Sequence, residues 1–314
     1  MAAASPELVL EPKKPREAPF AYRVQRRVEE YALLARLNKP IGIWLLLWPA
    51  LWALWISSDG RPHPKVLIVF VLGVVVMRSA GCVINDFADR DIDPHVRRTR
   101  DRPLAARRVS PTEALALFGV LMIIALVLVT RLDILTIKLA LIGAALTVSY
   151  PFVKRWFPMP QLYLGISFGG WSVPMAFAAQ TGALPRVAWV LYIAAVIWAA
   201  IYDTLYAMVD REDDLKIGVK SSAILFADMD RMLIGVMQAM MLFALVLVGR
   251  NMHLGRWYEG GLIAAGALFA FQQWLIRNRE PAGCLRAFLN NHYVGMCIFI
   301  GILLDYIYAV PNGQ

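Results

Sequence analysis

Charged residues are scarce in this chain, and so are the signatures of several common enzyme classes. Only 18% of the 314 residues are charged, compared with about 25% in soluble domains. There is no GxxxxGK[ST] loop and no HExxH motif, and the four histidines have no metal-ligand spacing, which disfavours nucleotide hydrolysis and zinc chemistry. The three cysteines form no CxxC pair and sit singly in or beside apolar segments, so we expect packing residues and no disulfide framework.

Apolar residues are correspondingly abundant, at 59% of the chain against about 45–50% in soluble domains. At about 20 apolar residues per crossing, the sequence supplies nine candidate spans. They lie near residues 40–58, 64–85, 112–131, 134–152, 160–180, 186–207, 232–249, 260–276 and 293–310. We therefore expect an all-helical integral membrane protein with nine transmembrane helices.

The net charge of +9 has two explanations. Binding to nucleic acid is one, but basic residues gathered on cytoplasmic loops explain the charge without such a partner. Arginine and lysine concentrate before the first span and after spans two, four, six and eight, whereas the opposite loops are short and carry few of them. We expect no nucleic-acid partner, a cytoplasmic N-terminus, cytoplasmic acidic motifs and a C-terminus outside.

Residues 1–35 differ in composition from the rest of the chain. A polar, proline-rich start is followed by FAYRVQRRVEEYALLARL, where aromatic and aliphatic residues alternate with arginines at helical spacing. This predicts an N-terminal tail and an interfacial amphipathic helix, with a polytopic domain in residues 36–314. The tail lacks the apolar core of a signal peptide, and Glu7, Glu11 and Glu17 are unusual for a mitochondrial transit peptide. A bacterial inner membrane is the expected location.

Two acidic clusters stand out because each follows directly on a span. The first contains Asn85, Asp86, Asp89 and Asp93, and the second contains Asp203, Tyr206, Asp210 and Asp214. The spacing of the aspartates places each cluster on one face of a helix. An aspartate alone in hydrocarbon costs on the order of 3 kcal/mol, so six of them predict a shared wet cavity. Since Mg²⁺ combines carboxylates with substrate phosphates, the clusters predict a clamp for a magnesium-bridged diphosphate.

Basic residues beside the clusters are candidates for binding the phosphate oxygens. These are Arg97, Arg98, Arg102, Lys154, Arg155 and Lys220, some of which we expect to be ordinary positive-inside residues. Arg78 is different, because it lies two turns deeper in span two than Asn85 and nearly on the same face. An arginine inside the membrane is a functional candidate by default. We favour the carboxylate of an acidic acceptor as its partner over snorkelling or a structural pair with an aspartate.

These motifs resemble those of the UbiA superfamily of intramembrane aromatic prenyltransferases. The superfamily's NDxxDxxxD motif matches residues 85–93, and its DxxYxxxDxxxD motif matches residues 203–214. The branch that prenylates 4-hydroxybenzoate in ubiquinone synthesis is the most similar, over most of residues 36–230. The similarity is carried by KPIGIWLLLWPALWALW, MRSAGCVINDFADRDID, SYPFVKRWFPMPQLYLGISFGGWSVPMAFAAQ and YAMVDREDDLKIGVKSSAILF.

The resemblance implies a nine-helix bundle around a central cavity, with a lateral opening to membrane lipid for the prenyl tail. The implied substrates are a polyprenyl diphosphate and 4-hydroxybenzoate, and the implied cofactor is Mg²⁺. The implied metal ligands are Asn85, Asp86, Asp89, Asp93, Asp210 and Asp214.

Further roles follow from the mechanism that we expect for this chemistry. Asp203, Tyr206 and Arg155 are expected to be catalytic, with Asp203 or a bound water accepting a ring proton. Arg78 or Arg36 is expected to position the acceptor carboxylate, and the loop at 97–110 to act as a lid over the cavity.

Two alternatives accompany this interpretation. The first is the same chemistry on another acceptor, such as a dihydroxynaphthoate, homogentisate, or a haem or chlorophyllide precursor. The second is a secondary transporter, since intramembrane charges also mark ion pathways. A transporter site is expected near the middle of the bilayer between broken helices, whereas these acids cluster at span ends on one side.

Overall fold

Helix forms almost throughout the part of the chain that the structure describes. The structure is a computed structural model that describes residues 20–95, 99–153, 155–218 and 220–308. The helices of these ranges are α1 (Phe20–Leu34), α2 (Ile41–Ile56), α3 (Pro64–Ala88), α4 (Pro111–Val129), α5 (Ile134–Val153), α6 (Pro160–Leu164), α7 (Ser172–Thr181), α8 (Arg186–Ile217), α9 (Ser222–Leu225), α10 (Asp230–Asn251), α11 (Arg256–Leu275) and α12 (Pro281–Tyr308). Shorter turns are η1 (Asp93–His95), the π-helical η2 (Gly165–Gly169) and η3 (Ala227–Met229). No strand occurs in these ranges.

Seven of the described helical segments are long and apolar enough to cross a membrane. Each of the nine expected spans coincides with a helical segment, but two fall outside this group. Of these, α2 has only 16 residues, and α11 carries charged residues in its first turn and two glutamines near its end. The all-helical, multi-pass membrane fold is confirmed, and the count of nine is approximate.

The helix ends place the two acidic motifs on different kinds of backbone. Helix α3 ends at Ala88, and Asp93 begins the separate turn η1; helices usually end at or before the residue that precedes a proline, here Pro94. The expectation that Asp86, Asp89 and Asp93 share one face of a continuous helix is therefore wrong. In contrast, α8 continues for 32 residues to Ile217 and is followed by Gly218, whose φ of 70° is the left-handed conformation typical of a helix end.

The expected span at 160–180 is interrupted. It consists of α6, the π-helical turn η2 and α7, and η2 packs against α8. A Cβ on Gly165 would lie only 2.6 Å from the carbonyl oxygen of Val196 in α8, so glycine is required for this close approach. Single π turns of this kind are frequent at functional sites.

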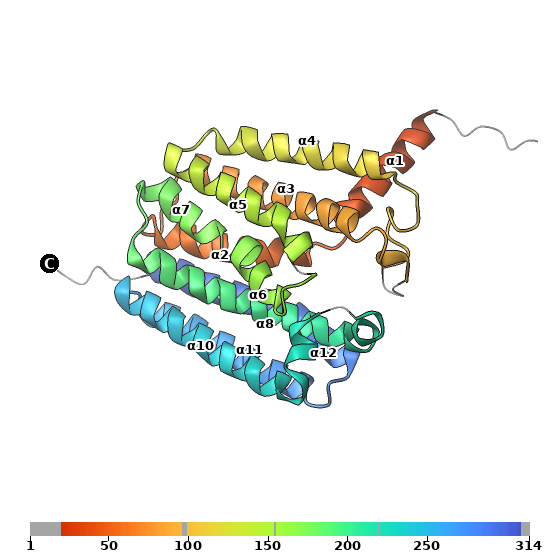
Figure 1. Cartoon of the computed structure of the whole chain (residues 1–314). Helices are drawn as coiled ribbons and strands as arrows, with labels where there is room; N and C mark the ends of the chain where they lie inside the picture. Colours follow the sequence, from red (N-terminus) through yellow and green to blue (C-terminus); the bar gives the residue numbers. More distant parts are fainter. Residues whose placement is uncertain (1–19, 96–98, 154, 219, 309–314) are drawn as a thin grey trace, which may run out of the picture.

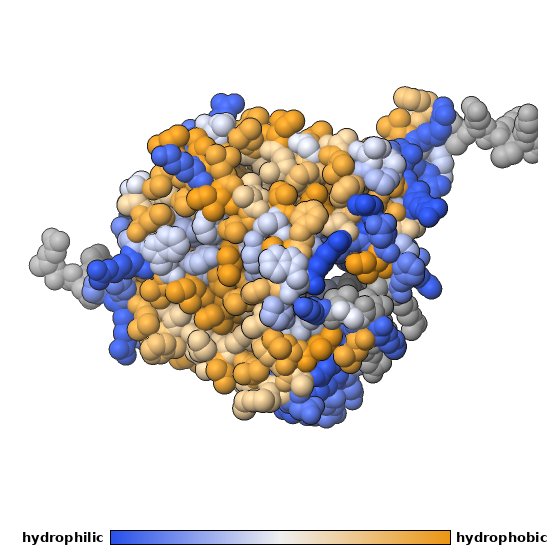
Figure 2. All heavy atoms as spheres, viewed as in Figure 1, coloured by the Kyte–Doolittle hydropathy of each residue, from blue (hydrophilic) through white to orange (hydrophobic). Residues whose placement is uncertain are grey.

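Helix α8 lies at the centre of the bundle. It packs against α10 and α12 on one side and against α6, η2 and α7 on another (Figure 1). Helix α4 lies at the periphery, and only 6% of its most apolar stretch is buried inside the protein. On the face shown in Figure 2, apolar residues cover most of the middle, and hydrophilic residues gather toward the two ends. This is the pattern expected of a bundle surrounded by lipid.

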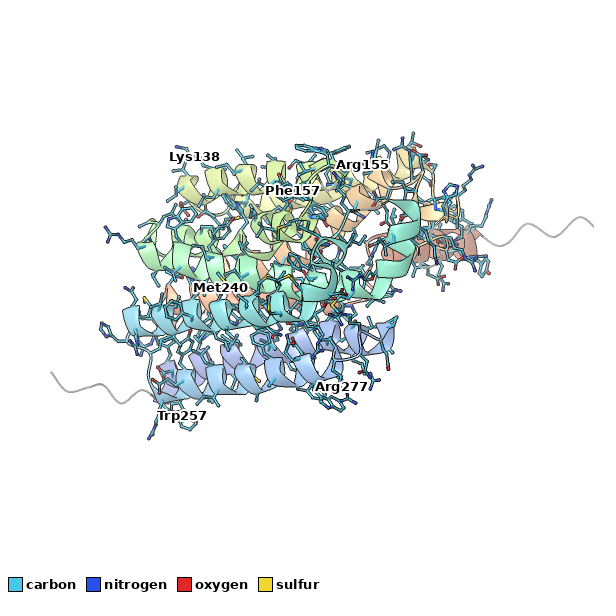
Figure 3. All side chains as sticks on the ribbon, turned by 60° about the horizontal axis from the view of Figure 1, so that its bottom comes forward. Lys138, Arg155, Phe157, Met240, Trp257 and Arg277 are labelled. Atoms are coloured by element: carbon cyan, nitrogen blue, oxygen red, sulfur yellow. The ribbon has the colours of Figure 1, made fainter. Side chains whose placement is uncertain are left out.

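Consecutive long helices run in alternating directions, so that α3, α5, α8 and α11 all finish at one end of the bundle (Figure 1). We call this the motif end. Arg155 and Arg277 lie toward it, whereas Lys138 and Trp257 lie toward the opposite end (Figure 3). Since the first acidic motif spans the end of α3 and the second lies in the last part of α8, the topology brings them to the same end.

Candidate active site

A cavity of about 640 Å³ opens at the motif end between α2, α3, α6 and α8. Both acidic motifs contribute to its wall. The first motif supplies Asn85, Asp89 and Asp93, and the second supplies Asp203, Tyr206, Asp210 and Asp214. The predicted convergence of two clusters separated by about a hundred residues of sequence is therefore present in the fold.

The first motif is organised by backbone and side-chain hydrogen bonds at the end of α3. The Asp89 backbone N–H donates to the Asn85 carbonyl oxygen at 2.9 Å, and the Asn85 amide donates to an Asp89 carboxylate oxygen at 3.1 Å. The Thr99 hydroxyl donates to the Asp93 carbonyl oxygen at 2.9 Å, which ties η1 to the segment that follows it. Burial raises the pKa of Asp93, and the positive charge of Arg102 opposes this rise.

Asp86 is turned away from the cavity. Its side chain is only 2% exposed, and it is not among the residues that line the wall. One carboxylate oxygen accepts from Arg36 at 2.6 Å and from Arg102 at 3.1 Å, and Arg102 also reaches Asp93 at 2.7 Å. The only member of the predicted first cluster that does not line the cavity is thus held in an ion-pair network.

The second motif lies on the last turns of α8. Tyr206 packs on the ring of Phe288 from α12, with 4.7 Å between the ring centroids. The chain after α8 folds back against it: the Thr204 and Ser222 hydroxyl oxygens lie 2.7 Å apart, and the Ser222 N–H donates to the Gln161 side-chain oxygen at 2.9 Å. These contacts fix the end of α8 against α6 and α12.

Several of the predicted basic residues reach the same cavity. Arg36, Arg102, Arg155 and Lys220 line it, together with Lys39, which the sequence did not single out. Arg155 donates to the Ala88 carbonyl oxygen at the end of α3 at 2.5 Å, and Lys220 donates to the Trp156 carbonyl oxygen at 3.2 Å. The predicted phosphate ligands Arg97, Arg98 and Lys154 lie outside the described residues.

Arg78 lies deeper in the cavity, on the inward face of α3. Its guanidinium donates to the thiol of Cys82 and lies directly over Gly42, where any Cβ would overlap it. Cys82 therefore contributes to the wall of the cavity and is more than the packing residue expected from the sequence. Gly42 was also missed; its only signal is its place in the KPIGIW segment.

Aromatic side chains complete the wall between the acidic mouth and the deeper part of the cavity. Tyr150, Tyr202 and Phe168 line it, and the rings of Tyr150 and Phe168 meet edge to face with centroids 5.9 Å apart. None of the three was predicted as a site residue. Scattered aromatic residues in apolar spans carry no spacing signal, because they resemble the rest of the core.

A second, apolar cavity of about 190 Å³ adjoins the first. It lies between α3, α4, α5 and α7, and it shares Leu46 and Phe168 with the polar cavity. Its wall contains mainly aliphatic residues and methionines, including Val74, Met77 and Met122. A molecule with a charged head and an apolar tail matches the two cavities taken together.

The residues of the polar cavity fit Mg²⁺, provided that substrate completes its coordination. Within the described ranges, no three acidic, histidine or cysteine side chains converge as a preformed metal site. Mg²⁺ is commonly bound by one or two carboxylates, waters and substrate phosphates. Asp89 and Asp93 on one wall, with Asp210 and Asp214 on the other, supply this type of oxygen ligand.

Comparison with known proteins identifies close relatives. Residues 46–306 match the UbiA prenyltransferase family. The chain is 60% identical over 279 residues to the 4-hydroxybenzoate octaprenyltransferase of Alkalilimnicola ehrlichii, covering 89% of this chain and 95% of that protein. It is 57% identical over 288 residues to the 4-hydroxybenzoate octaprenyltransferase of Methylococcus capsulatus, covering 92% and 98%.

Solved structures share the fold. A UbiA homolog from Aeropyrum pernix K1 superposes with a TM-score of 0.74 at 24% identity, covering 84% of this chain and 97% of that one. A UbiA homolog from Archaeoglobus fulgidus bound to GPP and Mg²⁺ has a TM-score of 0.69 at 16% identity, covering 90% and 100%. Since the family match extends over residues 46–306 and the relatives are more than half identical along most of the chain, the protein belongs to the UbiA prenyltransferase family.

Proposed function

We propose that this chain transfers a polyprenyl group from polyprenyl diphosphate to 4-hydroxybenzoate, at the ring carbon ortho to the hydroxyl, in a magnesium-dependent reaction. The product is 3-polyprenyl-4-hydroxybenzoate, an intermediate of ubiquinone synthesis. The observation that carries the proposal is that both acidic motifs and Arg78 line one cavity. The 60% identity to a 4-hydroxybenzoate octaprenyltransferase supports the choice of acceptor.

The diphosphate of the donor binds at the mouth of the cavity in this proposal. Asn85, Asp89, Asp93, Asp210 and Asp214 are the ligands for Mg²⁺, which when bound withdraws charge from the diphosphate. Arg36, Arg102, Arg155 and Lys220 surround the same region and donate hydrogen bonds to the non-bridging oxygens. Charge accumulates on the diphosphate as its bond to the prenyl carbon breaks, so these donors stabilise the transition state more than the ground state.

The prenyl tail passes between Leu46 and Phe168 into the apolar cavity. Both residues line the polar and the apolar cavity, so they mark the path between the two. Methionine and aliphatic side chains offer an adaptable surface to an isoprenoid chain. The rest of a long tail extends toward lipid, because α4 on this side is largely uncovered by protein.

The acceptor binds beside the breaking bond, with its carboxylate on Arg78. This guanidinium lies deep in the cavity over Gly42, on the same helix as Asn85. The electron pair of the breaking carbon–oxygen bond leaves with diphosphate, the ortho carbon of the ring forms the new bond to the prenyl carbon, and the ring then loses a proton. Asp203, or a water bound to it, accepts this proton, and Tyr206 lies one turn further along the same wall.

The membrane surroundings serve this chemistry, because water would intercept the electron-deficient prenyl carbon. Aromatic and aliphatic walls exclude water from the depth of the cavity. We propose a bacterial inner membrane as the location, with the motif end in the cytoplasm, where diphosphate and Mg²⁺ are available, and α1 in the interface. The arginines of α1 and of the loop before α4 agree with the positive-inside rule.

The decisive experiment is prenyl transfer by the purified protein in lipid vesicles. It uses polyprenyl diphosphate and radiolabelled 4-hydroxybenzoate, with Mg²⁺ in one arm and EDTA in the other. We expect labelled lipid product only with Mg²⁺. Diphosphate release with Mg²⁺ but without product would refute the acceptor and direct the search to dihydroxynaphthoate or homogentisate. Neither release nor product from folded protein would refute the enzymatic function.

A further inference from the structure

The second residue of the first motif, Asp86, has surroundings that differ from those of its neighbours in sequence. Asn85 in α3 and Asp89, which directly follows α3, both line the cavity, whereas Asp86 does not. One residue along a helix turns the side chain by about 100°, which directs Asp86 toward the connection between α1 and α2 and toward the loop that precedes α4. Its two partners, Arg36 and Arg102, come from these segments.

The two partners of Asp86 are themselves cavity residues. Both Arg36 and Arg102 line the polar cavity, while the carboxylate that joins them is buried behind it. The same oxygen accepts from Arg36 at 2.6 Å and from Arg102 at 3.1 Å. An arginine carries five N–H donors, so each guanidinium keeps further donors for a ligand in the cavity.

The backbone of Arg36 adds an independent observation. Its φ is 56°, the left-handed region that a residue with a Cβ rarely adopts. The Arg36 N–H donates to the Leu33 carbonyl oxygen at 3.0 Å, so α1 closes at this residue and the chain turns toward α2. Strained backbone of this kind persists where the surrounding structure fixes it, and it is frequent at ligand-binding sites. The ion pair with Asp86 holds the Arg36 side chain in place.

We propose that Asp86 is a positioning residue that fixes the guanidinium groups of Arg36 and Arg102 for the diphosphate of the donor, and that it is not a magnesium ligand. This proposal rests on the function proposed above. Arg102 contacts both Asp86 and Asp93. When Asp93 binds the metal ion, Asp86 still holds the Arg102 guanidinium at the rim of the cavity, where this guanidinium faces the phosphate oxygens.

The test compares Asp86→Asn with Asp89→Asn. For Asp86→Asn we expect the KM for polyprenyl diphosphate to rise by about ten- to hundredfold, while the Mg²⁺ concentration for half-maximal activity stays within about twofold of wild type. Asp89→Asn should instead shift the Mg²⁺ dependence strongly. Binding of Mn²⁺ in the presence of saturating prenyl thiolodiphosphate, followed by its electron paramagnetic resonance signal, supplies a readout besides activity: Asp86→Asn should bind Mn²⁺ like wild type and Asp89→Asn more weakly.

Two further measurements keep the proposal open to refutation. Arg36→Lys and Arg102→Lys retain the charge but lose the planar fork, so both should raise the donor KM even if Asp86→Asn folds poorly. The combination of Asp86→Asn with Arg102→Lys should be less than additive. A metal affinity reduced in Asp86→Asn as much as in Asp89→Asn, or an unchanged donor KM, would overturn the proposal. Wild type should bind an unreactive prenyl thiolodiphosphate even if 4-hydroxybenzoate is not its acceptor. This binding measurement therefore distinguishes a failure of the proposal about Asp86 from an error in the proposed acceptor.

Discussion

The roles proposed for individual residues depend on which carboxylates face the cavity. Asp89 lines it, directly after the end of α3, and its carboxylate is held by Asn85. Asp89→Asn keeps the shape of the side chain and removes its charge, so we expect turnover to fall by about a hundredfold or more. The measurement is the rate of prenyl transfer at saturating substrates. Asp91→Asn is the matched control, because this neighbouring side chain is 82% exposed; a similar loss in both variants would contradict the role of Asp89.

Gly42 is the second residue whose role is defined by its contacts. Only a glycine leaves room for the Arg78 guanidinium, since a Cβ at this position would overlap it. Gly42→Ala should therefore displace Arg78 and raise the KM for 4-hydroxybenzoate by about ten- to hundredfold, with little change in the KM for the donor. Steady-state kinetics with each substrate varied in turn measures this difference.

Gly119→Ala provides the control for that substitution. Gly119 lies in α4, and a Cβ there meets nothing within 4 Å. This variant should keep both KM values of wild type. If Gly42→Ala raised the KM of the donor instead, Arg78 would belong to the diphosphate site.

At the scale of the element, a buried ion-pair cluster holds the end of α8. Asp230, at the start of α10, is fully buried and accepts from Arg211 at 3.0 Å and from Arg279 at 3.0 Å. Arg211 directly follows Asp210 of the second motif, and Arg279 comes from the connection between α11 and α12. One carboxylate thus joins α8, α10 and the connection between α11 and α12 at the motif end.

Removing this carboxylate should destabilise the protein. Asp230→Ala leaves two arginines without this acceptor. A loss of about 3–5 kcal/mol is typical where the remaining charge is fully buried; the side chains of Arg211 and Arg279 are 23% and 34% exposed, so we expect a smaller loss. We expect a lower midpoint of thermal unfolding in detergent and weaker Mg²⁺ activation, because the end of α8 loosens. Asp228→Ala is the control, since its side chain is exposed and only its backbone oxygen accepts from Arg279. Equal unfolding midpoints for the two variants would show that the cluster contributes little.

Sequence patterns predicted the elements well because hydrophobic length and helix-end signals are local. The apolar segments, the convergence of the two motifs and the place of Arg78 in span two all followed from spacing. The orientation of Asp86 did not, because it depends on where α3 ends and on Arg36 and Arg102, which approach from other segments. Gly42 and the π turn at Gly165–Gly169 were missed for the same reason, since both serve contacts with distant helices.

At the scale of the whole molecule, a polar cavity at the motif end adjoins an apolar cavity, and Leu46 and Phe168 belong to the walls of both. Gly73 lines the apolar cavity, and a Cβ there meets nothing within 4 Å. Gly73→Leu should fill part of this space and reduce kcat/KM for long polyprenyl diphosphates by about tenfold. Dimethylallyl diphosphate is too short to reach the apolar cavity, so its kcat/KM in Gly73→Leu should equal that of wild type.

The control for this prediction is Gly119→Leu, on the lipid-facing side of α4, which does not line either cavity. Both variants add the same side chain to a membrane helix. Equal preference for long and short donors in Gly73→Leu and Gly119→Leu would show that the tail follows another route.

We expect the two acidic motifs to bind one diphosphate together with Mg²⁺ across the cavity. The most direct measurement is the anomalous scattering of Mn²⁺ in crystals grown with an unreactive prenyl thiolodiphosphate. We expect Mn²⁺ between the diphosphate and the carboxylates of Asp89, Asp93, Asp210 and Asp214, with Asp86 still paired to Arg36. Mn²⁺ outside the cavity, or a diphosphate held by one motif alone, would contradict it.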